Sequence, residues 1–143
     1  MFRFLKRRTK SALPPLWSDN HTLGKYGEDE VAKHLQKGGY KILQRNKKYA
    51  AHEVDIIAKD GNTVVFCEVK TRTASAEMQK KYGSPADFIT AEQKRNLFAA
   101  ANAYLRLTGE GKWRFDAAEV ILCRTESGFS IESLHYIKDA FRP

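Results

Sequence analysis

A buried β-hairpin is the feature of this sequence that most constrains its fold. Residues 53–59 and 63–70 are two largely apolar stretches that flank Asp60-Gly61, a dipeptide typical of two-residue hairpin turns. Apolar residues occupy positions of both parities in each stretch, which is typical of strands covered on both faces. A two-residue turn at Asp60-Gly61 would pair Lys59 with Asn62 and would set the register of the whole hairpin.

Acidic residues interrupt this hairpin at positions that share one face. In the predicted register Asp55 lies opposite Phe66 and diagonal to Glu68. The Cβ atoms of Asp55 and Glu68 would then lie about 7 Å apart. Residues two apart on a strand share a face, so Glu53 and Lys70 project from the same side as this pair. A turn of odd length would instead place Asp55 and Glu68 on opposite faces, unless a bulge restored the register. The predicted geometry aims two carboxylates at one point where a single cation can sit.

These charged side chains have a structural explanation and a chemical one. Glu68 and Lys70 alone are explained by a partly solvated ion pair at a strand end. Burying them more deeply costs free energy unless they are paired or bind a metal, and Asp55 at matching parity favours the metal. Carboxylate oxygens favour Mg²⁺ or Mn²⁺, which would polarise a phosphoryl oxygen and lower the pKa of a bound water. Lys70 would orient that water or act as a base, and the sequence leaves both roles open.

The elements around the hairpin indicate an α/β fold. Apolar residues with helical spacing begin near Asn20 and stop at Gly38-Gly39, and the capping box Thr90-Ala-Glu-Gln93 opens a second helix that ends at Gly109. The predicted order is helix, three strands, helix, two strands, with strands in residues 40–44, 53–59, 63–70, 114–122 and 129–137. Helices on both sides of the three-strand unit predict a mixed β-sheet flanked by helices.

Glu28 offers a further carboxylate. On the first helix it lies along the apolar stripe and near the N-terminus, whereas Asp29 and Glu30 are expected to point elsewhere and to be solvated. An acidic residue near the start of a helix is also stabilised by the helix dipole alone. Both explanations stay open until the rest of the pattern is considered.

The charge of the chain indicates a polyanionic partner. Lys and Arg number 25 against 17 Asp and Glu, a net charge of +8. Residues 1–19 hold five basic residues against Asp19, so +4 falls on this segment, which we interpret as a flexible basic arm ahead of a domain at residues 20–143. Nucleic acid and an anionic membrane surface are the main candidate partners, and a solubilising surface is the alternative.

Other features favour a soluble protein of the cytoplasm. No apolar run approaches the about 18 residues of a spanning helix, and residues 1–5 are too short for the apolar core of a signal peptide. Cys67 and Cys123 are predicted to be reduced thiols, because neither has the spacing of a zinc site.

Two groups of basic residues are candidates for contacts with phosphates. Lys94 and Arg95 open the second helix, where positive charge is unfavourable, so a phosphate partner explains them better. Arg72, Lys80 and Lys81 lie in the aperiodic segment before that helix and would extend the same surface. Such contacts position a nucleic acid without reading its sequence.

These residues resemble a known nuclease signature. Asp55, twelve intervening residues and then Glu68-Val69-Lys70 resemble the PD-(D/E)XK motif, and the element order is similar to the αβββαβ core of restriction-endonuclease-like enzymes. A larger ordered set, over about residues 20–137, resembles the bacterial YraN family, which is regarded as related to archaeal Holliday-junction resolvases. That set comprises Gly24-x-x-Gly27-Glu28, Glu53-Val-Asp55-Ile-Ile-Ala58, Glu68-Val-Lys-Thr-Arg72, Gly83-Ser-Pro85 and Arg114-Phe-Asp116. Val54 replaces the signature's Pro, and His52 replaces a Gly expected in relatives.

The resemblance implies a catalytic site. Asp55 and Glu68 would ligate Mg²⁺ or Mn²⁺ with help from the Val69 carbonyl, Lys70 would be catalytic, and Glu28 would complete the site. The implied activity is metal-dependent hydrolysis of DNA phosphodiester bonds, with branched or structured DNA as a candidate substrate.

Several alternatives stay open at this point. One is a nucleic-acid-binding module with the same fold and without catalysis, and another is an interaction protein whose arm docks on an anionic surface. RNA is not excluded as the partner, because no feature reads a 2′-hydroxyl. Resolution of a junction needs two active sites, which a homodimer would supply.

Overall fold

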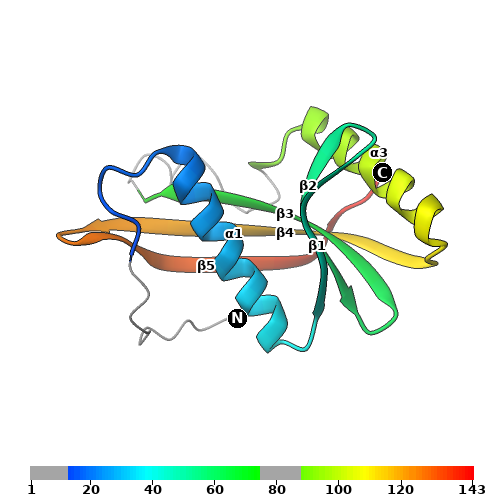
Figure 1. Ribbon diagram of the computed structural model, residues 1–143, viewed down its shortest axis with the longest axis horizontal. Coiled ribbons are helices and arrows are strands. Elements are labelled where there is room, and N and C mark those ends of the chain that lie inside the picture. Colours follow the sequence, from blue (N-terminus) through cyan, green and yellow to red (C-terminus); the bar gives the residue numbers. More distant parts are fainter. Residues whose placement is uncertain (1–12, 75–87) are drawn as a thin grey trace.

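The computed structural model describes residues 13–74 and 88–143 and has the predicted order of elements (Figure 1). In these ranges lie the helices α1 (Asn20–Lys37) and α3 (Ala91–Thr108) and the strands β1 (Lys41–Tyr49), β2 (His52–Asp60), β3 (Thr63–Thr73), β4 (Lys112–Thr125) and β5 (Gly128–Phe141). Thr90 accepts a hydrogen bond from the Gln93 N–H, and the Gln93 side chain accepts one from the Thr90 N–H, so the predicted capping box is confirmed.

The five strands form one mixed sheet in the order β1-β2-β3-β4-β5. Neighbouring strands run antiparallel except β3 and β4, which are parallel and are connected through α3. This arrangement is the predicted α/β fold with a restriction-endonuclease-like core.

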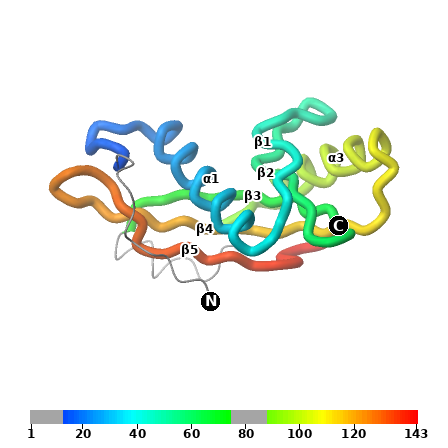
Figure 2. Tube along the Cα trace, turned by 60° about the horizontal axis from the view of Figure 1, so that its bottom comes forward, coloured from blue at the N-terminus to red at the C-terminus, as the bar shows by residue number. Residues whose placement is uncertain are grey.

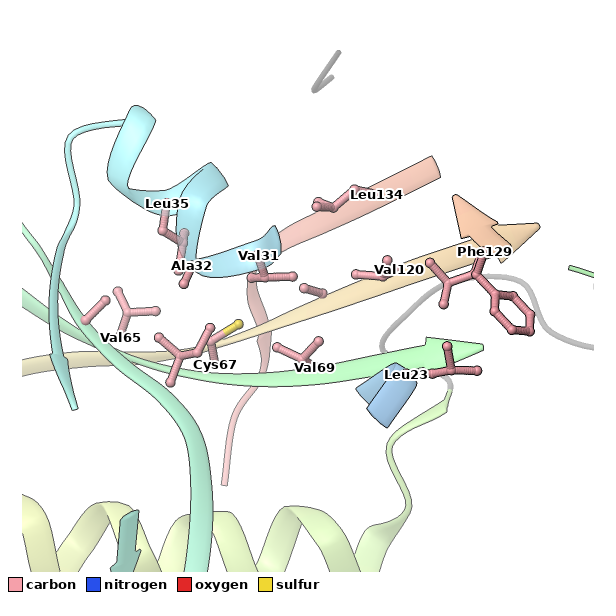
Figure 3. Close-up of a cluster of buried hydrophobic side chains, with 14 residues drawn as sticks. Leu23, Val31, Ala32, Leu35, Val65, Cys67, Val69, Val120, Phe129 and Leu134 are labelled. Atoms are coloured by element: carbon pink, nitrogen blue, oxygen red, sulfur yellow. The ribbon is translucent and has the colours of Figure 1, made fainter. Parts of the chain in front are cut away.

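The two helices cover opposite faces of the sheet. Figure 3 shows Val31, Ala32 and Leu35 of α1 beside Val65, Cys67 and Val69 of β3. The alternate residues of the sheet belong to a second cluster with α3, in which Phe66 and Phe115 contact each other with their ring centroids 5.5 Å apart. Figure 2 shows the β1–β2 hairpin rising between the two helices. Strands with both faces buried explain why the sequence is apolar at positions of both parities.

The predicted register of the β2–β3 hairpin is wrong: Phe66 lies opposite Ile57 rather than Asp55, and the turn is shifted by one residue. Asp60 is the last paired residue and lies opposite Thr63, so the turn is Gly61-Asn62 rather than Asp60-Gly61. Gly61 has a φ of 61°, which favours glycine, and the Asp60 carboxylate pairs with Arg114 at 3.0 Å, which keeps Asp60 in the strand. The loop still has two residues, so Asp55 and Glu68 keep the same parity.

Part of the segment predicted as a flexible arm lies against the domain. The Phe129 N–H donates to the Pro14 carbonyl at 2.8 Å, and Pro14 is buried. A side chain at Gly128 would overlap with that carbonyl. The folded unit therefore begins before Asn20, and the basic residues at positions 3–10 lie outside the described residues. Within the described ranges, neither helix is both long and apolar enough to cross a membrane.

Candidate functional site

Asp55 and Glu68 meet where the β2–β3 ladder ends. The last paired residues are Ile56 and Cys67, and beyond them the Val69 N–H donates to the Asp55 carboxylate at 2.8 Å instead of to a backbone carbonyl. This bond holds the Asp55 side chain of β2 against β3, directly beside Glu68. Asp55 and Glu68 are both half-buried. The structure therefore brings the two predicted carboxylates to the same place.

Burial raises the pKa of both carboxyl groups, and neighbouring charges modify the effect. Burial is the largest cause of the raised pKa of Asp55 and the negative charge of Glu68 is the second, while the hydrogen bond from Val69 opposes them. Burial likewise raises the pKa of Glu68 to about 7, and the positive charge of Lys70 partly offsets this effect. Keeping both carboxyl groups ionised in this buried place therefore costs free energy, and a divalent cation between them would offset that cost.

Glu28 belongs to the same electrostatic cluster. Its negative charge raises the pKa of both Asp55 and Glu68, and that of Glu53 adds to the effect. Gly27 allows α1 to approach β3 closely, because a side chain at this position would overlap with Thr71. The prediction that Glu28 faces the acidic pair is consistent with this arrangement.

The neighbours of Glu28 on α1 differ from expectation. Asp29 is exposed and pairs with Arg45 at 2.7 Å. Glu30 is buried and lies 3.3 Å from Lys33, so its predicted solvation is wrong. The Lys33 ammonium group reduces the cost of burying this carboxylate.

Lys70 lies on the same face of β3 as Glu68. It is half-buried, and its partner in the parallel register with β4 is Glu119. Among the described residues, no carboxylate lies within ion-pair distance of the Lys70 ammonium group. This position leaves Lys70 close to the acidic pair without fixing it in a structural ion pair.

The donor set fits a hard divalent cation with few protein ligands. In residues 13–74 and 88–143 no three His, Cys, Asp or Glu side chains gather as a preformed metal centre. Mg²⁺ commonly binds one or two carboxylates and keeps several waters, so Asp55, Glu68 and the Val69 carbonyl form a sufficient set. Soft ligands are absent from this set, which disfavours zinc and copper.

Arg72, one of the predicted phosphate contacts, lies in a buried ion pair. Its Nε lies 3.0 Å from a Glu119 oxygen, and the two side chains are only 14% and 8% exposed. The guanidinium group also stacks over the ring of Phe88, 3.6 Å from its centroid. These contacts give Arg72 a structural role, and its predicted contact with a phosphate is untested.

The other predicted phosphate contacts differ in exposure. Lys94 is half-buried, with its ammonium group 5.2 Å from the centroid of Phe141, whereas Arg95 is exposed. Lys80 and Lys81 lie outside the described residues, as do Gly83, Ser84 and Pro85.

Sequence reasoning missed two residues near the site. Glu119 interrupts an apolar run of β4 between Ala118 and Val120, a signal that could have revealed its buried ion pair. Asn46 donates to the Glu28 carboxylate at 2.7 Å, and no pattern indicates this contact because β1 is polar along most of its length.

The Arg114-Phe-Asp116 motif is structural. The Asp116 carboxylate is fully buried and accepts from Arg114 Nε at 2.9 Å, from the Tyr136 hydroxyl at 2.6 Å and from the Asp139 N–H at 2.8 Å. This network joins β4 to β5, and Arg114 extends it to Asp60 at the end of β2. Its hydrogen bonds compensate for burial of the charge.

The chain matches the model of one known protein family. The model of Uncharacterised protein family UPF0102 matches residues 27–120, a range that contains Glu28, Asp55, Glu68 and Lys70. The chain belongs to family UPF0102. The resemblance to the YraN family is thereby confirmed, since UPF0102 is that PD-(D/E)XK-like group.

UPF0102 proteins of several bacteria are similar to most of the chain. The UPF0102 protein of Chlorobium chlorochromatii (strain CaD3) is 41% identical over 121 residues, which are 83% of this chain and 90% of the relative. The UPF0102 protein of Clostridium botulinum (strain Loch Maree / Type A3) is 37% identical over 126 residues, 86% of this chain and 96% of the relative. That of Nitratidesulfovibrio vulgaris (strain DP4) is 38% identical over 123 residues, 85% of this chain and 84% of the relative.

Proposed function

We propose that this UPF0102 protein is an endonuclease that uses Mg²⁺ or Mn²⁺ to hydrolyse DNA phosphodiester bonds. The observation that carries the proposal is the half-buried acidic pair Asp55 and Glu68, fixed by the 2.8 Å bond from Val69 N–H at the end of the β2–β3 ladder. Two carboxylates with raised pKa values and a lysine on the same face are a suitable site for metal-assisted attack on phosphorus.

Each residue of the site has a separate task. Asp55 and Glu68 would hold the cation, assisted by the Val69 carbonyl. A cation bound there would supply Lewis-acid polarisation of a phosphoryl oxygen and a more acidic water. Lys70 orients the attacking water and offsets charge that develops on the phosphate, and Glu28 completes the acidic cluster.

Exposed basic residues support a polyanionic substrate. Arg95 is exposed on α3, and Lys47 and Lys48 are exposed on the edge strand β1, next to the strand that bears Asp55. Contacts of these residues with phosphates would be independent of sequence, which suits a branched or structured DNA. A homodimer would supply the two sites needed to cut both strands of a junction.

Cleavage by the full chain tests this proposal. A four-way junction, a flap, a duplex and a single strand are incubated with Mg²⁺, Mn²⁺ or EDTA, for the wild type and for the variants D55N, E68Q and K70M. We expect metal-dependent cleavage of at least one substrate and a loss of about 100-fold or more in each variant. The variant D29N changes an exposed carboxylate on α1 and is expected to cleave like the wild type. A D55N variant that cleaves at the wild-type rate would contradict the proposal.

The second candidate is a DNA-binding module without hydrolysis. It is favoured by the lack, among the described residues, of a preformed group of three metal-ligating side chains. Salt-sensitive DNA binding that is indifferent to divalent metal, with no cleavage of any of the four substrates, would support it over the nuclease.

A further inference from the structure

Asn46 of β1 connects two charged side chains of α1. Its amide nitrogen donates to a Glu28 carboxylate oxygen at 2.7 Å, and its amide oxygen accepts from the Lys25 ammonium group at 2.8 Å. The bond to Glu28 is partly buried, whereas the bond to Lys25 is exposed. Asn46 thus links Lys25 at the surface of α1 to Glu28, the carboxylate whose charge raises the pKa of Asp55 and Glu68.

The orientation of this amide follows from the chemistry of its neighbours. An ammonium group can only donate, so the side chain must present Oδ1 to Lys25. An ionised carboxylate can only accept, so Nδ2 must face Glu28. Reversing the amide would lose both bonds, and the arrangement therefore permits one orientation.

The backbone of Asn46 is suited to this task. Its φ is 50°, in the left-handed region, which asparagine tolerates better than most residues other than glycine. The flanking residues Arg45 and Lys47 pair with Ile56 and Val54 of β2, so Asn46 lies beside Asp55 in the sheet. The register places Asn46 next to Asp55, and the two hydrogen bonds hold its amide against α1.

We propose that Asn46 is a positioning residue for catalysis, which orients Glu28 by donating its amide N–H, and that Lys25 fixes the direction of that amide. The proposal rests on the proposed nuclease function and names a residue through which Glu28 would act. A purely conformational role is the alternative, because asparagine is also chosen for a positive φ. The tests therefore separate the amide from the backbone.

Cleavage kinetics distinguish the two roles. N46G keeps the positive φ at no steric cost and removes the amide. N46D keeps the shape and places a carboxylate against Glu28. We expect both variants to lower kcat by about 10-fold to 100-fold, the usual effect of a lost hydrogen bond to a charged group, with KM for DNA unchanged. Wild-type kcat in N46G would overturn the proposal.

A double-variant cycle tests whether Asn46 acts through Glu28. If it does, N46G adds no further loss of kcat in the E28Q background. Multiplied losses would overturn the proposal. D29N serves as the matched control, since the Asp29–Arg45 ion pair links the same two elements without reaching the amide. D29N combined with N46G is expected to lose no more than N46G alone.

A measurement without cleavage keeps the inference separate from the nuclease proposal. In a ¹H–¹⁵N spectrum the side-chain NH₂ pair of Asn46 is identified by its disappearance in N46G. We expect E28Q and K25M to shift this pair and D29N to leave it unchanged. An unshifted pair in E28Q would overturn the inference even if DNA is cleaved. A shifted pair in a protein that cleaves no DNA would mean that the nuclease proposal fails while the contact stands.

Discussion

At the scale of single residues, the site buries two carboxyl groups whose ionised forms are unfavourable there. Asp55 and Glu68 are held together although burial raises the pKa of both and the negative charge of Glu28 adds to the effect on each. An uncharged residue would be more stable here, so this cost supports the proposed cation, which would relieve it. The hydrogen bond from Val69 to Asp55 shows that the backbone is arranged to keep the pair in place.

Removing the charge of Glu68 is expected to stabilise the protein in the absence of metal. The pKa of Glu68 is raised to about 7 on folding, so the folded state binds the proton more tightly than the unfolded chain. Stability is then highest below the ordinary pKa of Glu and falls as pH rises through about 7. E68Q should therefore raise the free energy of unfolding by roughly 2 kcal/mol at pH 8 and leave it unchanged at pH 4.

Urea denaturation at both pH values in EDTA measures this effect. E132Q, at an exposed carboxylate of β5, is the control and should change little at either pH. A loss of stability in E68Q at pH 8 would mean that Glu68 contributes a favourable interaction rather than a cost.

At the scale of elements, the distance between α1 and β3 sets the position of Glu28. Gly27 and Gly24 both lie on α1, but only a side chain at Gly27 would overlap with Thr71, while nothing lies within 4 Å of one at Gly24. The pair offers a test with a built-in control. G27A should lower the free energy of unfolding by about 1–3 kcal/mol through overpacking, whereas G24A should raise it by about 0.5–1 kcal/mol through helix propensity. Equal effects of the two substitutions in urea denaturation would contradict the close approach of α1.

The β1–β2 hairpin has a strained turn. Ala50 and Ala51 connect the last pair, Tyr49 and His52, with φ values of 53° and 65°. The left-handed region costs a non-glycine residue about 1–2 kcal/mol. The double variant A50N/A51G provides the dipeptide that such turns prefer and should stabilise the protein by about 1–2 kcal/mol, measured by thermal and urea denaturation. S127G, in the β4–β5 turn at a residue without positive φ, should give no such gain. Destabilisation by A50N/A51G would show that the turn has a different conformation.

The sequence predicted these elements better than the contacts between them. Apolar positions of both parities predicted the buried hairpin correctly, because burial on two faces leaves a clear pattern. The turn position was wrong because Asp60-Gly61 and Gly61-Asn62 are both good turn dipeptides, and the ion pair of Asp60 with Arg114 decides between them. This error does not affect the predicted site, because either two-residue turn places Asp55 and Glu68 on the same face of the sheet.

The partners in contacts between distant segments were not predictable, although Glu119 within an apolar run signals a buried ion pair. The sequence predicts Arg72 as a surface cation, whereas in the structure it forms an ion pair with Glu119 of β4. Asn46 had no signal because its role depends on the approach of α1 to β1. Both residues contact side chains of segments that are distant in the sequence.

At the scale of the whole molecule, positive charge favours a long polyanion over a small substrate. The net charge is +8, and residues 3–10 hold five of the basic residues. Deleting residues 1–12 keeps Pro14, which accepts from Phe129, so the fold should be retained. We expect weaker binding of DNA and a smaller dependence of log Kd on log salt, measured by fluorescence anisotropy, with binding by the core retained. Complete loss of binding would mean that the core contributes no DNA contacts.

The most direct test of the central claim is a crystal structure of the full chain soaked in Mn²⁺, with the metal located by anomalous scattering. We expect a Mn²⁺ ion between Asp55 and Glu68, about 2.1–2.3 Å from an oxygen of each, and no ion in crystals of the double variant D55N/E68Q. A Mn²⁺ ion bound elsewhere, or carboxylates that turn away from each other without binding one, would contradict it.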